Sequence, residues 1–273
     1  MSESQPMNNR YLLDEGTEAI DRLALVQRIY GSGSRAMLLA AGSLEGRRVL
    51  ELGCGTGSMT RWLAEQVGEG GVVVGADASG AQLEVARARC AGFPSVRFVC
   101  ADASDTGLAP GEFDLVYLRL LLMHVPAPQT VLAHAHALLR PGGSVLCEEA
   151  AIDSTFTDPP LPEQRELHAL ANEMARERGC DFNVARRLGS LVRASGFELV
   201  TLSAQQPVLL RGPEKRLEVA SFEEAMQHWP QASDETRARG ARVIASLASA
   251  ASDEETVYGL SMMMRARGRK PHR

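Results

Sequence analysis

Short apolar runs alternate with helical segments through the first half of the chain, and this alternation constrains the fold most. The runs rich in β-branched residues lie at 48–52, 72–76, 96–100, 113–118 and 144–147, and segments with helical spacing lie between them at 58–67, 79–91 and 128–139. Strands that alternate with helices form βαβ units, and near-continuous apolar strands fit a sheet covered on both faces. The pattern predicts an α/β, Rossmann-like fold with a doubly wound, mostly parallel sheet.

The flanking segments predict helices around that core. Apolar residues at helical spacing between Thr17 and Ala41 predict two helices, with a break at Gly31–Ser34. After Glu149 the pattern predicts helices at about 163–178, 185–194, 213–227 and 233–248, and strands at 197–202 and 257–264. We therefore expect an N-terminal helical cap at 1–45, an α/β core at 46–150, and, at 151–273, the rest of the core with helical insertions that cover the substrate.

Composition excludes several classes of protein. The chain has 273 residues, of which 45% are hydrophobic and 23% charged, as in ordinary folded proteins. A net charge of −5 gives no general attraction to nucleic acid. The five cysteines show no C-x-x-C spacing, so neither a disulfide framework nor a zinc site is indicated, and no metal is expected. Without an apolar run of about 18–20 residues or features of a secretory signal, we expect no membrane span and a cytoplasmic location.

A glycine-rich turn directly follows the first predicted strand. It reads Glu51-Leu52-Gly53-Cys54-Gly55-Thr56-Gly57. A P-loop would need a lysine at its end, and a G-x-G-x-x-G dinucleotide fingerprint fails because its third glycine position falls on Ser58 or Thr60. The remaining pattern, acidic-x-G-x-G-x-G, places a carboxylate before the glycines. It suits a ligand that carries an ammonium group better than one that carries a pyrophosphate.

Two more carboxylates follow the next two predicted strands. Asp77 ends the second strand, where a carboxylate can accept hydrogen bonds from both ribose hydroxyls, as it also does in NAD enzymes. Asp102 follows the third strand and can accept from an adenine amino group, while the N–H of Ala103 can donate to the ring. Carboxylates at three successive strand ends therefore predict an adenosine linked to an amino acid with a positive centre.

At this point the sequence resembles the class I S-adenosylmethionine-dependent methyltransferases. The matching segments are VLELGCGTGS (49–58), VVVGAD (72–77), CADA (100–103), FDLVYLRLLLMHV (113–125) and LLRPGG (138–143), in the order and spacing of the family. The resemblance implies a seven-stranded sheet whose last strand is antiparallel, since YGLSMMMRARGRKP and the strand near Phe197 resemble the family's closing pair. The opening Tyr11-Leu12-Leu13 and Arg22-Leu23 resemble an N-terminal cap of members that act on small molecules.

The resemblance also implies a set of S-adenosylmethionine-binding residues. Glu51 would hold the methionine ammonium group, and Asp77 with Ala78 would hold the ribose. The remaining implied contacts are Gly53, Gly55 and Gly57 with methionine and ribose, Asp102 and Ala103 with adenine, and Tyr11 from the cap. Arg119 would contribute either its backbone carbonyl to the ammonium group or its side chain to a carboxylate, and the sequence leaves both open.

Two residues are candidates for a catalytic base. His124 follows the fourth strand and can take a proton from a hydroxyl or an amine, although the same position can also serve packing. Glu148 and Glu149 end the fifth strand, where substrates of open α/β sheets lie. Glu149 is the carboxylate we expect near the substrate, as base or as a contact.

The sequence predicts methyl transfer to oxygen or nitrogen of a small acceptor, assisted by His124 or Glu149. The apolar cap suggests a hydrophobic acceptor, such as a secondary metabolite. Two rivals are other methyl acceptors: protein, and nucleic acid, which is disfavoured because residues 117–120 lack the Asn/Asp-Pro-Pro-aromatic pattern. Two more are an NAD-dependent oxidoreductase, disfavoured by the glycine register, and a ligand-binding protein that has lost catalysis. We expect no nucleic-acid or membrane partner, and a monomer or homodimer.

Overall fold

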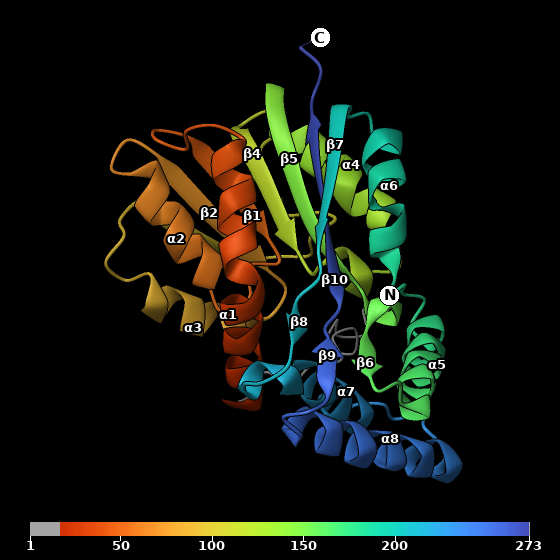
Figure 1. Ribbon diagram of the computed structural model, residues 1–273. Helices are drawn as coiled ribbons and strands as arrows, with labels where there is room; N and C mark the ends of the chain where they lie inside the picture. Colours follow the sequence, from red (N-terminus) through yellow and green to blue (C-terminus); the bar gives the residue numbers. More distant parts are fainter. Residues whose placement is uncertain (1–16, 273) are drawn as a thin grey trace, which may run out of the picture.

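The computed structural model describes residues 17–272, so Tyr11 lies outside the described residues. A seven-stranded sheet forms its centre, in the order β3-β2-β1-β4-β5-β10-β7 (Figure 1). Its strands are β1 (Arg48–Leu52), β2 (Val72–Asp77), β3 (Val96–Cys100), β4 (Phe113–Arg119), β5 (Leu139–Ala151), β7 (Glu198–Gln205) and β10 (Met262–Arg269). Strands β1 to β5 pair in parallel, and β10 is antiparallel to both β5 and β7. The predicted Rossmann-like sheet with an antiparallel last strand is confirmed.

Helices cover both faces of this sheet. One face packs against α1 (Thr17–Ala40) and α2 (Ser58–Val67), with α3 (Gly80–Arg89) beside α2. The other face packs against α4 (Pro128–Leu138) and α6 (Leu188–Ala194). Both faces of β4 are therefore buried, which is why its sequence reads as a continuous apolar run.

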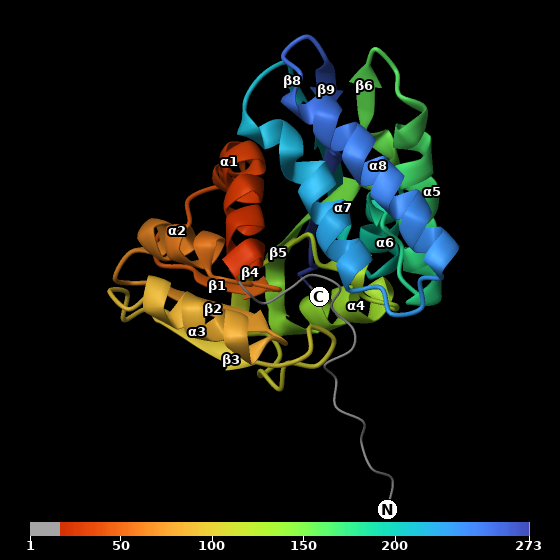
Figure 2. The ribbon, with the colours of Figure 1, turned by 90° about the horizontal axis from the view of Figure 1, so that it is seen from below.

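Beyond the carboxyl ends of the parallel strands lies a second group of elements (Figures 1 and 2). It contains α5 (Pro162–Glu177), α7 (Leu217–Gln227), α8 (Asp234–Ser252) and a small sheet of β6 (Phe156–Asp158), β9 (Val257–Gly259) and β8 (Val208–Leu209). Helix α7 contacts α1, and the two helices lie together at the carboxyl edge of the main sheet. The division of the chain at residues 45 and 150 stays a prediction.

The predicted single strand at 257–264 is wrong, because the chain forms two strands, β9 and β10, in different sheets. The break falls at Leu260 and Ser261. There the Ser261 N–H donates to the buried Glu218 carboxylate, and the Ser261 carbonyl accepts from the Tyr30 hydroxyl. Side chains thus replace the ladder partners that a continuous strand would have used.

The predicted break at Gly31–Ser34 is also wrong, because α1 continues through it. A Cβ atom on Gly33 would collide with Nη2 of Arg265 and with Oε1 of Gln205. This glycine therefore lets two long polar side chains of the sheet reach the helix surface. Arg265 is held there by Glu148, whose Oε2 accepts from Arg265 Nε at 2.7 Å while its Oε1 accepts from the Tyr117 hydroxyl.

Candidate active site

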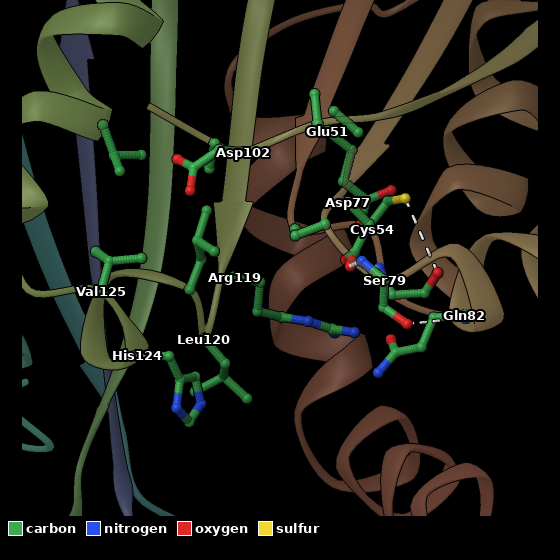
Figure 3. Close-up of a pocket in the computed structure, with 18 of the residues that line it drawn as sticks. Glu51, Cys54, Asp77, Ser79, Gln82, Asp102, Arg119, Leu120, His124 and Val125 are labelled. Atoms are coloured by element: carbon green, nitrogen blue, oxygen red, sulfur yellow. Dashed lines mark hydrogen bonds between the residues drawn. The ribbon is translucent and has the colours of Figure 1, made fainter. Parts of the chain in front are cut away.

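A cavity of about 700 Å³ opens at the carboxyl edge of the sheet. Its wall combines the turns that follow β1, β2, β3 and β4 with the first half of α1 and His228 after α7. Small-molecule sites in proteins usually measure roughly 300–1,000 Å³ and lie at this edge in open α/β sheets. Figure 3 shows Glu51, Asp77, Ser79 and Gln82 along one wall and Asp102 and Val125 across the cavity from them.

The glycine-rich turn shapes the floor of this cavity. Gly53, Gly55 and Gly57 all have φ between 52° and 73°, a conformation that costs other residues free energy. Gly53 and Gly55 line the cavity, whereas Gly57 is not among its lining residues. A Cβ on Gly57 would lie 2.9 Å from Cβ of Ala86 on α3, so this glycine lets two helices pack closely.

Glu51 is a buried carboxylate in the cavity wall. Its Oε2 accepts a hydrogen bond of 2.5 Å from the Thr60 hydroxyl. Burial raises the pKa of Glu51 to about 7, against the lowering effects of the Thr60 hydrogen bond and of the charge on Arg119. Glu51 is therefore a group whose ionised form gains from a cation in the cavity.

Asp77 and Asp102 present carboxylates at the next two strand ends. Asp77 accepts from the Gly55 N–H at 2.8 Å through Oδ2 and from the Ser79 N–H at 2.9 Å through Oδ1. Asp102 accepts from both the N–H and the hydroxyl of Ser104 through Oδ1. These hydrogen bonds orient each carboxylate at its strand end. Ala78 and Ala103, which follow the two aspartates, also line the cavity.

Arg119 ends β4, and its side chain extends into the cavity (Figure 3). Its Nη1 lies 3.5 Å from the Ser34 hydroxyl oxygen, at the limit of a hydrogen bond. The guanidinium is close enough to Glu51 to lower that group's pKa. A cation thus stands in a cavity with three carboxylates, where it can take a carboxylate of a ligand. The backbone-carbonyl alternative stays a prediction.

His124 lines the cavity from a short 3-10 turn, Leu122–His124. Burial, together with the nearby charges of Arg22 and Arg178, lowers its pKa to about 3. Its ring stacks edge to face on Phe182, with centroids 5.9 Å apart. At neutral pH His124 is therefore a neutral imidazole with little affinity for a proton.

Glu149 and Glu148 do not line the cavity, although the sequence placed them near the substrate. Glu149 is fully buried, and its carboxylate accepts from the N–H groups of Leu121, Leu122 and Met123 at 3.0, 2.7 and 3.3 Å. The adjoining Leu120 has a φ of 52°, which is strained for a leucine. Glu149 thus fixes the turn that carries the cavity wall and His124, a positioning role that the sequence reasoning missed.

Several further lining residues had no assigned site role in the sequence interpretation, among them Ser79, Gln82 and His228. Ser79 caps α3 by accepting from the Gln82 N–H, and a serine just after Asp77 is the expected cap of the next helix. His228 comes from a distant helix, and only the fold brings it to this cavity. Within residues 17–272 no group of three His, Cys, Asp or Glu side chains is arranged to hold a metal ion.

Comparisons with known proteins agree with this geometry. Residues 49–143 match the family model described as a methyltransferase domain. Among curated proteins, demethylmenaquinone methyltransferase of Staphylococcus aureus is 33% identical over 129 residues, which cover 47% of this chain and 51% of that protein. The chain spans about half the length of the curated relatives it matches.

Solved structures share the fold at low sequence identity. YcgJ protein of Bacillus subtilis has a TM-score of 0.60 at 15% identity, over 88% of this chain and 99% of that one. Phosphoethanolamine N-methyltransferase 2 of Haemonchus contortus, in complex with S-adenosylhomocysteine, has a TM-score of 0.55 at 19% identity, over 96% of this chain and 55% of that one. These structures show the fold, while the family model matches residues 49–143 to a methyltransferase domain, so the resemblance to the class I S-adenosylmethionine-dependent family is confirmed.

The hydrogen bonds of Glu149 generate a first prediction. We expect Glu149→Gln to lower the free energy of unfolding by about 1–3 kcal/mol, because an amide retains only one acceptor oxygen for three buried N–H donors. Amide hydrogen exchange at residues 121–123 should accelerate more than exchange in β1. Glu65→Gln, at an exposed site on α2, serves as the control and should leave both quantities unchanged. Unaltered exchange at 121–123 in Glu149→Gln would contradict the positioning role.

Proposed function

We propose that this protein is an S-adenosylmethionine-dependent methyltransferase that acts on a small molecule. The observation that carries the proposal is the meeting of three carboxylates, Glu51, Asp77 and Asp102, from neighbouring strand ends in one cavity beside the glycine turn. The methyltransferase domain at 49–143 contains all three. S-adenosylmethionine combines an ammonium group, a ribose and an adenine, and each finds a carboxylate suited to it here.

Different residues of the cavity would bind different parts of the ligand. Glu51 would hold the ammonium group, and Arg119 would pair with the methionine carboxylate. Asp77 would accept from the ribose hydroxyls with Ala78 beside it, and Asp102 would accept from the adenine amino group while the Ala103 N–H donates to the ring. Gly53 and Gly55 line the cavity without side chains, so the ligand can approach the backbone of the turn closely. The bound molecule supplies a methyl group on a sulfonium, a good leaving group.

The protein itself contributes alignment and exclusion of water. Alignment of two reactants supplies on the order of 7–11 kcal/mol when the attack geometry is well held. His124, as a buried neutral imidazole, is placed to hydrogen-bond the acceptor, but its low pKa makes it a weak base. We therefore assign His124 to orienting an oxygen or nitrogen acceptor, and Glu149 to fixing the wall that carries His124.

A small acceptor fits the site better than a macromolecule. The cavity is lined by side chains from both the sheet edge and α1, with α7 packed against α1, and its volume is that of a small-molecule site. Demethylmenaquinone methyltransferase and phosphoethanolamine N-methyltransferase are named for small-molecule acceptors. Protein and nucleic-acid methylation are the alternatives, and an NAD-dependent oxidoreductase is the distant one.

One binding experiment separates the proposal from the NAD alternative. We expect S-adenosylhomocysteine to bind the purified protein with heat detectable by calorimetry and NADH not to bind. Transfer of a radiolabelled methyl group from S-adenosylmethionine into the small-molecule fraction of a cell extract should survive nuclease and protease treatment of the extract. Tight NADH binding without S-adenosylhomocysteine binding would reject the proposal, and loss of transfer after nuclease or protease treatment would favour a macromolecular acceptor.

The raised pKa of Glu51 predicts a pH dependence of cofactor affinity. The ligand's ammonium group favours the ionised carboxylate, and Glu51 gains a proton as the pH falls through about 7. We expect the dissociation constant of S-adenosylhomocysteine to rise below pH 7, by up to about tenfold per pH unit. The measurement is calorimetric titration between pH 5.5 and 8.5, a range in which His124, with a pKa of about 3, does not titrate.

Two variants identify the titrating group. Glu51→Gln should weaken binding at pH 8 and flatten the pH profile. Glu149 also has its pKa raised to about 7 by burial, so Glu149→Gln is the matched control and should retain the slope. A profile that is flat in the unmodified protein, or that Glu149→Gln abolishes, would show that Glu51 does not hold the ammonium group.

No helix among residues 17–272 has the length and apolar character needed to cross a membrane. The cytoplasmic location, the absence of a membrane or nucleic-acid partner, and the monomeric or homodimeric state stay predictions.

A further inference from the structure

One side of the cavity, which we call the acceptor side, contains an arginine that has no proposed contact with the cofactor. We define this side by Arg22, Leu23, Val26, Leu120, His124 and His228, which line the cavity away from the three carboxylates' strand ends. Arg22 comes from α1, and only 7% of it is exposed. A charged side chain is seldom buried to this degree unless its hydrogen-bonding groups are paired.

The contacts of Arg22 account for only part of its guanidinium. Its Nε donates to Oε2 of Glu224 on α7 at 2.7 Å, and both side chains are buried. This ion pair connects α1 to α7 and fixes the plane of the guanidinium. Nη2 is buried and contacts no hydrogen-bond acceptor of the described chain. A buried donor of this kind costs free energy until an acceptor reaches it.

The charges on the acceptor side point to the kind of ligand. Within residues 17–272 the acidic side chains that line the cavity are Glu51, Asp77 and Asp102, all assigned to the cofactor. The acceptor side presents a guanidinium, two imidazoles and apolar side chains, without a carboxylate of its own in the lining. The positive charge of Arg22 also acts on His124, where it helps to lower the pKa and so to keep the imidazole neutral. Such a surface disfavours a cationic amine and favours an oxyanion.

We propose that the methyl acceptor carries an oxyanion, a carboxylate or an ionised phenol, that accepts a hydrogen bond from the Arg22 guanidinium. The inference rests on the proposed function and narrows its substrate class. Glu224 holds Arg22 in place from the far side, so Glu224 is a positioning residue for this contact. Leu23, Val26 and Leu120 surround the apolar remainder of the acceptor.

Binding of matched acids and amides tests this assignment. The probes are 4-hydroxybenzoate with 4-hydroxybenzamide and octanoate with octanamide, titrated by NMR into protein saturated with S-adenosylhomocysteine at pH 7.5. We expect at least one acid to bind roughly 10- to 100-fold more tightly than its amide, as a hydrogen bond to a charged group provides. Arg22→Gln should abolish that preference, and Arg28→Gln, at an exposed site on the same helix, should preserve it.

A second variant guards against loss of structure. Arg22→Gln removes the arginine that pairs with the buried Glu224 carboxylate. The double variant Arg22→Gln, Glu224→Gln removes both charges together and should also lose the acid preference. The proposal is overturned if neither acid is preferred over its amide, or if the preference persists in both variants. It is also overturned if Arg22→Gln weakens S-adenosylhomocysteine binding tenfold or more, since Arg22 would then hold the cofactor's carboxylate. Failure of S-adenosylhomocysteine to bind the unmodified protein would instead reject the proposed function.

Discussion

The carboxylate of Asp77 is the contact on which the geometry of the site depends. It accepts from the Gly55 N–H in the turn after β1 and from the Ser79 N–H in its own turn, so one side chain joins two neighbouring strand ends. The turn after β1 is further tied to β2, because the N–H groups of Gly53 and Cys54 both donate to the Ala76 carbonyl. The positive φ angles of the glycines make this path possible, and the same lack of side chains leaves space for a ligand. The same residues, Asp77 and the glycines, thus fix the geometry of the turn and form the proposed binding site for the ligand.

The opposite wall of the cavity depends on buried charges. Glu149 holds three consecutive N–H groups beside a strained Leu120, and Glu224 holds Arg22 between α1 and α7. Each carboxylate lies outside the lining and sets the position of a group inside it. A buried acid whose oxygens already accept several hydrogen bonds has little capacity left for a substrate proton. For this reason Glu149 serves the site by position, whereas His124 and Arg22 line the cavity and are the residues proposed to contact the acceptor. The proposed chemistry is therefore alignment of two bound molecules, with little demand for a strong base.

The fold was predictable because its determinants are local in sequence. Five apolar runs with helices between them define the parallel strands. The acids at or just after the ends of β1, β2 and β3 reach one edge because parallel strands end together. Long-range contacts explain what the sequence could not provide. Gly33 reads as a helix break but admits Arg265 and Gln205 from the sheet, and Ser261 divides the last predicted strand because Glu218 and Tyr30 satisfy its backbone. Glu149 lies two residues before the end of β5, at the expected edge, yet its carboxylate points toward the backbone of the turn that follows β4. No pattern in the sequence shows whether the Glu149 side chain points toward that turn or into the cavity.

The central claim is that carboxylates at neighbouring strand ends hold an adenosyl amino acid. Its most direct test is the dissociation constant of S-adenosylhomocysteine for Asp77→Ala and Asp102→Ala, measured by calorimetry beside the unmodified protein, with circular dichroism to confirm that each variant is folded. The account predicts that each substitution weakens binding by about tenfold or more, as expected for hydrogen bonds to a charged group. Affinity that is unchanged in both folded variants would contradict the account, because the ligand would then bind elsewhere.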